Sequence, residues 1–116
     1  MEETSQLKKF RAILSRIDTL LLIVLNMKKN PGLSNEGLLE IETEIIKTRD
    51  ETAIVVGQLK ANLGLPVCCP DQEEAKLKSL IKIAENMGMA ISEGEIRQYF
   101  CQIFTKSKEL QKRKKA

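Results

Sequence analysis

Aromatic and turn-forming residues are scarce in this chain. Its 116 residues include no Trp, one Tyr, three Phe, six Gly and three Pro. So few Gly and Pro disfavour a fold of many short strands joined by turns, and the abundance of Leu, Ile, Val and Ala favours long helices. A chain of this length suits one core, so we expect a single domain over residues 1–116.

Histidine is absent, and the three cysteines are poorly placed for pairing. Cys68 and Cys69 are adjacent, whereas Cys101 is remote from both. This spacing does not fit a zinc site. We interpret the cysteines as free thiols in a reducing compartment, which predicts a cytoplasmic protein.

The sequence also lacks a long apolar run and a large net charge. The longest run, Leu20–Leu25, is too short to span a bilayer, and the acidic, polar N-terminus does not look like a signal peptide. Much of the net charge of +3 lies in residues 106–115, which we interpret as a solvated helix end. We therefore expect neither a membrane nor a nucleic acid as partner.

Two segments with helical periodicity flank a strong break at Asn30-Pro31-Gly32. The first runs from about residue 5 to 29, and the second from about 34 or 35 to 62. One unbroken helix over 5–62 would be about 85 Å long, which is too long for so small a domain. A hairpin is the alternative, and folding about residue 32 places Arg11 opposite the stretch near Ala53.

Two further helices follow. The third is predicted after Pro70, with Asp71 as its N-cap and an apolar stripe that extends to Met87. The fourth opens on a capping box, Ser92-Glu-Gly-Glu95. Four helices with short connections predict an all-α four-helix bundle.

Two cations interrupt the apolar face of the second helix. Arg49 and Lys60 are separated by about three helical turns, so they share this face at about 16 Å from each other along the axis. The hairpin places Arg11 opposite the gap between them. Burying a charge without a partner is costly, so such a cluster needs internal carboxylates or an anionic ligand.

Other polar residues extend this cluster. Glu73, in the first turn of the third helix, is a candidate internal carboxylate, and Ser107 and Gln111 lie one turn apart on the fourth helix. Together these residue types describe a pocket for a small polyanion with hydroxyl and ether groups. Taken singly, each of these residues is better explained as a structural residue or as a long side chain that extends to the surface. The prediction of a pocket therefore depends on all of them together.

Two blocks of the sequence resemble the all-helical chorismate mutases. The first covers residues 7–25, with an Arg, then Ile-Asp, then a Leu-rich run. The second covers residues 49–111 and matches the family pattern at Arg49-(10 residues)-Lys60, Gly-Leu-Pro-Val at 64–67, Asp71-Gln-Glu-Glu74 and Ser107-(3 residues)-Gln111.

The resemblance implies an activity, the pericyclic rearrangement of chorismate to prephenate in aromatic amino acid biosynthesis. Arg11 and Arg49 would bind the two substrate carboxylates, and Lys60 and Gln111 would donate to the ether oxygen of the breaking bond. The reaction requires no nucleophile, general base, metal or cofactor, which agrees with a chain that lacks His. The enzyme would select the reactive conformer and stabilise negative charge on the ether oxygen.

The remaining implied site residues include departures from the family pattern. Glu73 would accept a hydrogen bond from the ring hydroxyl, and Ser107 would support a carboxylate. Gln72 would also contact substrate, although the family commonly has an Arg there, and Cys69 replaces a frequent Asp.

The largest departure is an insertion before Arg49 that contains Asn-Pro-Gly. Family members typically have one long helix there, and two paired chains exchange their first Arg between sites. In this chain the usual long first helix is broken into a hairpin near Asn30-Pro31-Gly32, which returns Arg11 to its own chain. We therefore expect each site to be built from one chain, in a monomer or a homodimer.

Two other functions are compatible with these residues. A lyase that removes pyruvate from isochorismate makes similar demands on the pocket. A non-catalytic helical bundle that binds a ligand or a partner protein would tolerate Gln72 and Cys69 without loss.

Overall fold

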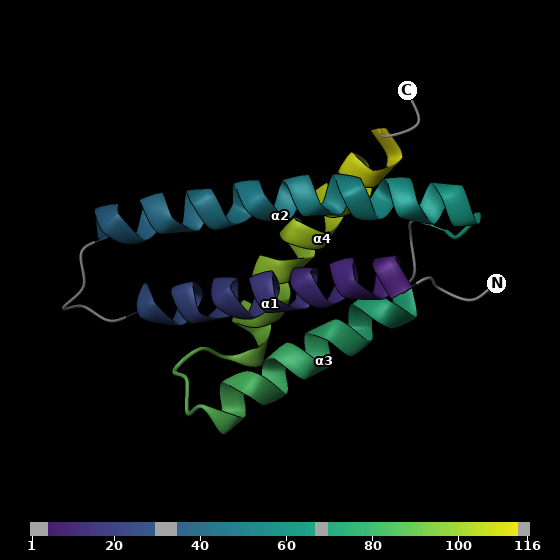
Figure 1. Cartoon of the computed structure of the whole chain (residues 1–116). Helices are drawn as coiled ribbons and strands as arrows, with labels where there is room; N and C mark the ends of the chain where they lie inside the picture. Colours follow the sequence, from purple (N-terminus) through teal and green to yellow (C-terminus); the bar gives the residue numbers. More distant parts are fainter. Residues whose placement is uncertain (1–4, 30–34, 67–69, 114–116) are drawn as a thin grey trace.

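The computed structural model describes residues 5–29, 35–66 and 70–113, which form four α-helices (Figure 1). Their bounds are α1 Ser5–Met27, α2 Asn35–Leu63, α3 Pro70–Asn86 and α4 Glu93–Arg113. These three ranges contain no strand. The prediction of an all-α fold with four helices is therefore confirmed.

α1 and α2 lie side by side and antiparallel, with α3 below α1 and α4 crossing behind both (Figure 1). Asp18 pairs with Arg49 and Lys28 pairs with Glu42 across the two helices. These charged pairs fix a register in which Arg11 shares a cavity with Val56, about one turn beyond the predicted Ala53. The predicted break at residues 30–32 lies outside the described residues, as do Cys68 and Cys69.

The apolar core consists of two clusters of buried side chains. The larger joins α1, α3 and α4 and comprises Ile17, Leu21, Leu22, Leu80, Ala84, Ile91, Ile96, Phe100 and Phe104. The smaller joins α1 and α2 and comprises Leu7, Leu14 and Val56. A cavity is lined by Leu14 and Val56 of the smaller cluster and by Phe104 of the larger one, so it lies where the two clusters meet.

The helix ends show which local signals were correct. The Ser92 hydroxyl accepts from the Glu95 N–H at 3.2 Å and the Glu95 carboxylate accepts from the Ser92 N–H at 3.0 Å, which confirms the capping box. The prediction of Asp71 as N-cap is wrong, because α3 already begins at Pro70, a residue suited to the first helical position. Met87 is also misassigned: α3 ends at Asn86, and Met87 is exposed.

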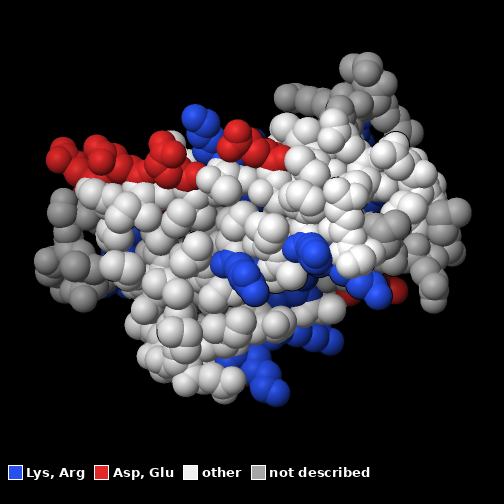
Figure 2. Space-filling view, viewed as in Figure 1, with Lys and Arg blue, Asp and Glu red and all other residues white. Residues whose placement is uncertain are grey.

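Acidic side chains gather on the outer face of α2. Figure 2 shows acidic side chains along the outer face of α2, where Glu36, Glu40 and Glu44 are exposed, and basic side chains over α1 and α3. None of the described helices is long and apolar enough to cross a membrane. Because exposed charges are solvated, the informative polar groups are those buried between the helices.

Candidate active site

The cavity between the two core clusters has a volume of about 280 Å³ and is lined by all four helices. Its polar lining includes Arg11 from α1, Arg49 and Lys60 from α2, Gln72, Glu73 and Lys76 from α3, and Ser107, Lys108 and Gln111 from α4. All seven residues predicted as a site from the sequence are therefore brought together. The volume suits a small metabolite, because pockets for drug-sized ligands span about 300–1,000 Å³.

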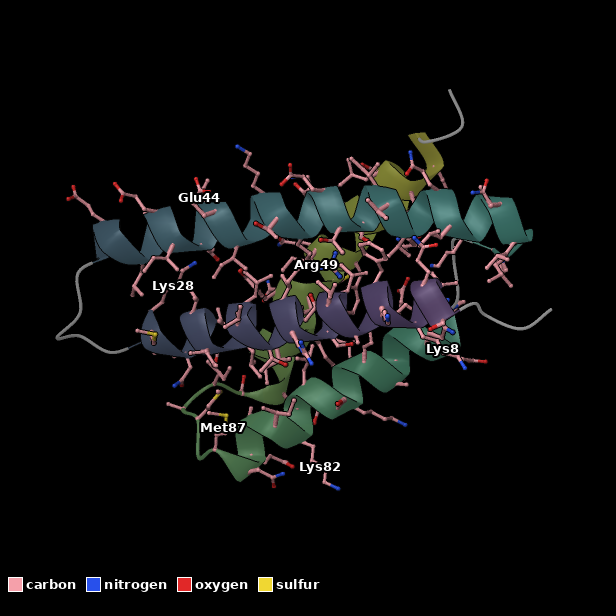
Figure 3. All side chains as sticks on the ribbon, in the orientation of Figure 1. Lys8, Lys28, Glu44, Arg49, Lys82 and Met87 are labelled. Atoms are coloured by element: carbon pink, nitrogen blue, oxygen red, sulfur yellow. The ribbon has the colours of Figure 1, made fainter. Side chains whose placement is uncertain are left out.

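Arg49 is the most deeply buried cation of the site. Its side chain is 2% exposed and points from α2 toward α1, whereas Glu44 points away from the bundle (Figure 3). Arg49 Nε donates to Asp18 Oδ1 at 2.6 Å and Nη2 lies 3.4 Å from Asp18 Oδ2. Asp18 is also 2% exposed, so the pair compensates two charges that would be costly to bury singly.

Three more buried polar side chains line the cavity: Lys60 from α2, and Ser107 and Gln111 from α4. Lys60, Ser107 and Gln111 are 7%, 6% and 6% exposed. Gln111 Nε2 donates to Ser107 Oγ at 3.2 Å, as the spacing of four residues along a helix allows. Among the described residues no group donates to the buried Gln111 Oε1, so this oxygen can accept from a ligand.

Gly57 sets the position of Gln111. A Cβ atom added at Gly57 would lie 2.8 Å from Gln111 Cα and 2.9 Å from Gln111 Cβ. Only a residue without a side chain permits α2 and α4 to approach this closely. The contact therefore places Gln111 beside the α2 residues that line the cavity.

Glu73 and Gln72 lie at the α3 side of the cavity. Glu73 Oε2 pairs with Lys108 Nζ at 3.2 Å, and both side chains are about one-third exposed. Gln72 is exposed at the rim. Glu73 is thus held by a cation that the sequence reasoning did not include.

Lys76 is a further cation in the cavity that was not predicted. Its Nζ lies 4.0 Å from Asp18 Oδ2 and 5.7 Å from the centre of the Phe104 ring. Burial lowers the pKa of Lys76, and the charges of Arg49 and Arg11 lower it further, whereas Asp18 and Glu73 oppose this shift. Its position three residues after Glu73 was the available signal, because residues so spaced share a helix face.

The cavity is strongly cationic as a whole. Among the described residues that line it, Arg11, Arg49, Lys60, Lys76 and Lys108 are cationic and Glu73 is the one carboxylate, with Asp18 behind Arg49. The electrostatics of such a cavity suit a small polyanion. The described residues contain no group of three or more His, Cys, Asp or Glu that could hold a metal ion.

The family model for chorismate mutase type II matches residues 42–112. This match covers more than half of the chain, and the chain belongs to this family. The matched region contains the site residues of α2, α3 and α4, whereas α1 with Arg11 precedes it. Comparisons with curated proteins and with solved structures found no match.

Proposed function

We propose that this protein is a chorismate mutase that converts chorismate to prephenate. The observation that carries the proposal is the cavity in which Arg11, Arg49 and Lys60 meet Ser107 and Gln111. Chorismate presents two carboxylates, a ring hydroxyl and an ether oxygen, and these residue types match each of those groups. Membership of the chorismate mutase family supports the same substrate class.

We assign the two carboxylates to the cationic residues on facing helices. Arg11 approaches from α1 and Arg49 from α2, so a dianion between them is held from both sides. A planar guanidinium suits a carboxylate because its donors are in a fixed fork. Asp18 uses Nε and Nη2 of Arg49, so substrate would bond to Nη1. Ser107 would support a carboxylate.

We assign the reacting ether oxygen to Lys60 and Gln111. Both side chains are buried, which strengthens their attraction for negative charge that develops as the C–O bond breaks. The Gln111 amide donates to Ser107 here, and a small rotation of its side chain would redirect it to substrate. Glu73 would accept from the ring hydroxyl, and Gln72 at the rim would contact the ring side of the substrate.

The rearrangement is intramolecular, so the protein's contribution is geometric and electrostatic. Fixed contacts to both carboxylates hold the chair-like conformer in which the bond-forming carbons are close. Lys60 and Gln111 then stabilise the transition state more than the ground state, which is the condition for catalysis.

The test is conversion of chorismate, followed as loss of its absorbance with prephenate identified as product. Lys60→Ala removes a charged donor to the developing oxyanion and is expected to lower kcat by about 100- to 1,000-fold. Lys47→Ala, on the exposed face of the same helix, serves as the matched control and is expected to retain wild-type activity. Full activity in Lys60→Ala would refute the assigned mechanism.

The same assay separates the competing functions. Isochorismate should be offered alongside chorismate, because pyruvate release from it would identify a lyase. Tight binding of a bicyclic diacid that mimics the transition state, without turnover of either substrate, would identify a non-catalytic binding protein.

A further inference from the structure

Lys76 lies at the end of the cavity near Phe104 and has no part in the roles assigned above. Its Nζ is 5.7 Å from the centre of the Phe104 ring, and Arg49 Cζ lies over the same ring at the same distance. Both cations also contact Asp18, Arg49 directly and Lys76 at 4.0 Å. Two cations therefore share one carboxylate and one aromatic ring.

The two cations differ in their freedom to meet a ligand. Arg49 is 2% exposed and is held by two hydrogen bonds to Asp18, whereas the Lys76 side chain is 33% exposed. Asp18 compensates about one of the two positive charges, and Glu73, which also acts on Lys76, is itself paired with Lys108. A flexible lysine stem can move its ammonium group from the 4.0 Å contact toward an anion in the cavity.

We propose that Lys76 is a substrate-binding residue that contacts one carboxylate of the dianion at the Phe104 end of the cavity, together with Arg49. This inference rests on the proposed function, because it needs a dianionic ligand in the cavity. Lys76 provides a movable cation at this end of the cavity, whereas Gln72 at the rim is neutral.

The charges around Lys76 make this binding depend on pH. Arg11 and Asp18 face it from α1, Arg49 from α2, Glu73 from its own helix, and Lys108 lines the same cavity from α4. Burial and the two arginines lower the pKa of Lys76 in the free protein. A bound dianion stabilises the protonated form, so it raises that pKa and binding takes up a proton. Affinity is therefore greatest below the pKa of free Lys76 and falls as the pH rises through it.

The experiment is calorimetric titration with a bicyclic diacid that mimics the transition state, over a range of pH and in buffers of different ionisation enthalpy. Lys76→Met removes the charge at similar length and is expected to bind the diacid about 10- to 100-fold more weakly, without proton uptake. Lys76→Arg keeps a permanent cation, so it should retain affinity but lose the pH dependence. Lys78→Met, exposed on the same helix, should behave as wild type.

The outcomes separate this inference from the proposed function. Wild type that binds the diacid but does not convert chorismate overturns the mutase proposal, and the Lys76 variants still report on binding. Wild-type affinity and proton uptake in Lys76→Met overturn the role of Lys76 alone, whatever the activity. Absence of diacid binding to wild type overturns both. Unchanged helicity in Lys76→Met, by circular dichroism, ensures that weak binding reflects the lost cation.

Discussion

At the scale of single residues, the Asp18–Arg49 pair joins two oppositely charged side chains that are almost completely buried. Both side chains are 2% exposed and their closest atoms are 2.6 Å apart. Removing two charges from water costs several kcal/mol for each ion, and close pairing is what offsets that cost. The pair holds Arg49 with its guanidinium at the cavity, so the same contact serves stability and ligand binding.

Asp18→Asn tests this pair directly. The substitution keeps the shape of the side chain but leaves Arg49 as an uncompensated buried charge, so we expect a loss of about 3 kcal/mol or more in the free energy of unfolding. Chemical denaturation measures the loss. Asp50→Asn, which breaks the more exposed pair of Asp50 and Lys106, is the matched control and should cost less than about 1 kcal/mol. Equal losses in the two variants would show that the buried pair has no special role.

The sequence identified many of the buried polar residues but not their partners. Arg49 and Lys60 interrupt an apolar stripe at helical spacing, which is a local signal. Asp18 directly follows Ile17 on the buried side of α1, and its partner is 31 residues away, so the pairing depends on the register of two helices. Lys76 was missed for a related reason: its contacts lie on α1 and α4, and its own helix shows only that it shares a face with Glu73.

At the scale of helices, the close approach of α2 and α4 at Gly57 determines the shape of the site. Gly57 is buried and lies three residues before Lys60, directly against Gln111. The two proposed donors to the ether oxygen are thus placed by one contact between helices. A wider spacing would move Gln111 away from Lys60 without altering either residue.

Gly57→Ala should therefore damage both packing and activity. The added methyl group would lie 2.8 Å from Gln111 Cα, so the helices must separate, and overpacking of this kind costs about 1–3 kcal/mol. Gly37→Ala is the matched control, because it adds the same methyl group to α2 where no atom lies within 4 Å. It should gain up to about 1 kcal/mol from helix propensity. Thermal unfolding and kcat are the measurements, and a Gly57→Ala variant as active and stable as wild type would contradict the packing argument.

Local signals predicted the helices well and their ends less well. The capping box at Ser92 and Glu95 formed as expected, because both partners lie within one turn. Asp71 was misplaced by two positions and Met87 by one at the ends of α3, where sequence patterns alone do not distinguish the last helical residue from the first residue outside. The closeness of Gly57 to Gln111 had no local signal, because it depends on how two helices cross.

At the scale of the whole molecule, the separation of α1 from α2 decides which chain supplies Arg11. The family match begins at residue 42 and so contains most of α2, with α3 and α4, while α1 lies outside it. In the structure α1 packs back along α2, and Arg11 lines the cavity with Arg49 and Lys60 of the same chain. The antiparallel packing of α1 on α2 thus brings Arg11 to the cavity of its own chain. In one unbroken helix, Arg11 would lie far from Arg49 and Lys60.

We therefore expect that two inactive variants cannot restore each other. Arg11→Ala and Lys60→Ala should each abolish most activity, and chains of both kinds, denatured together and refolded as a mixture, should remain inactive because every cavity draws both residues from one chain. If sites were shared between chains, a mixed dimer would contain one cavity with both side chains intact, and activity would return. Refolding wild type with Lys60→Ala controls for recovery and should yield activity in proportion to the wild-type chains. Sedimentation of the active enzyme then shows whether these independent sites occur in a monomer or in a homodimer.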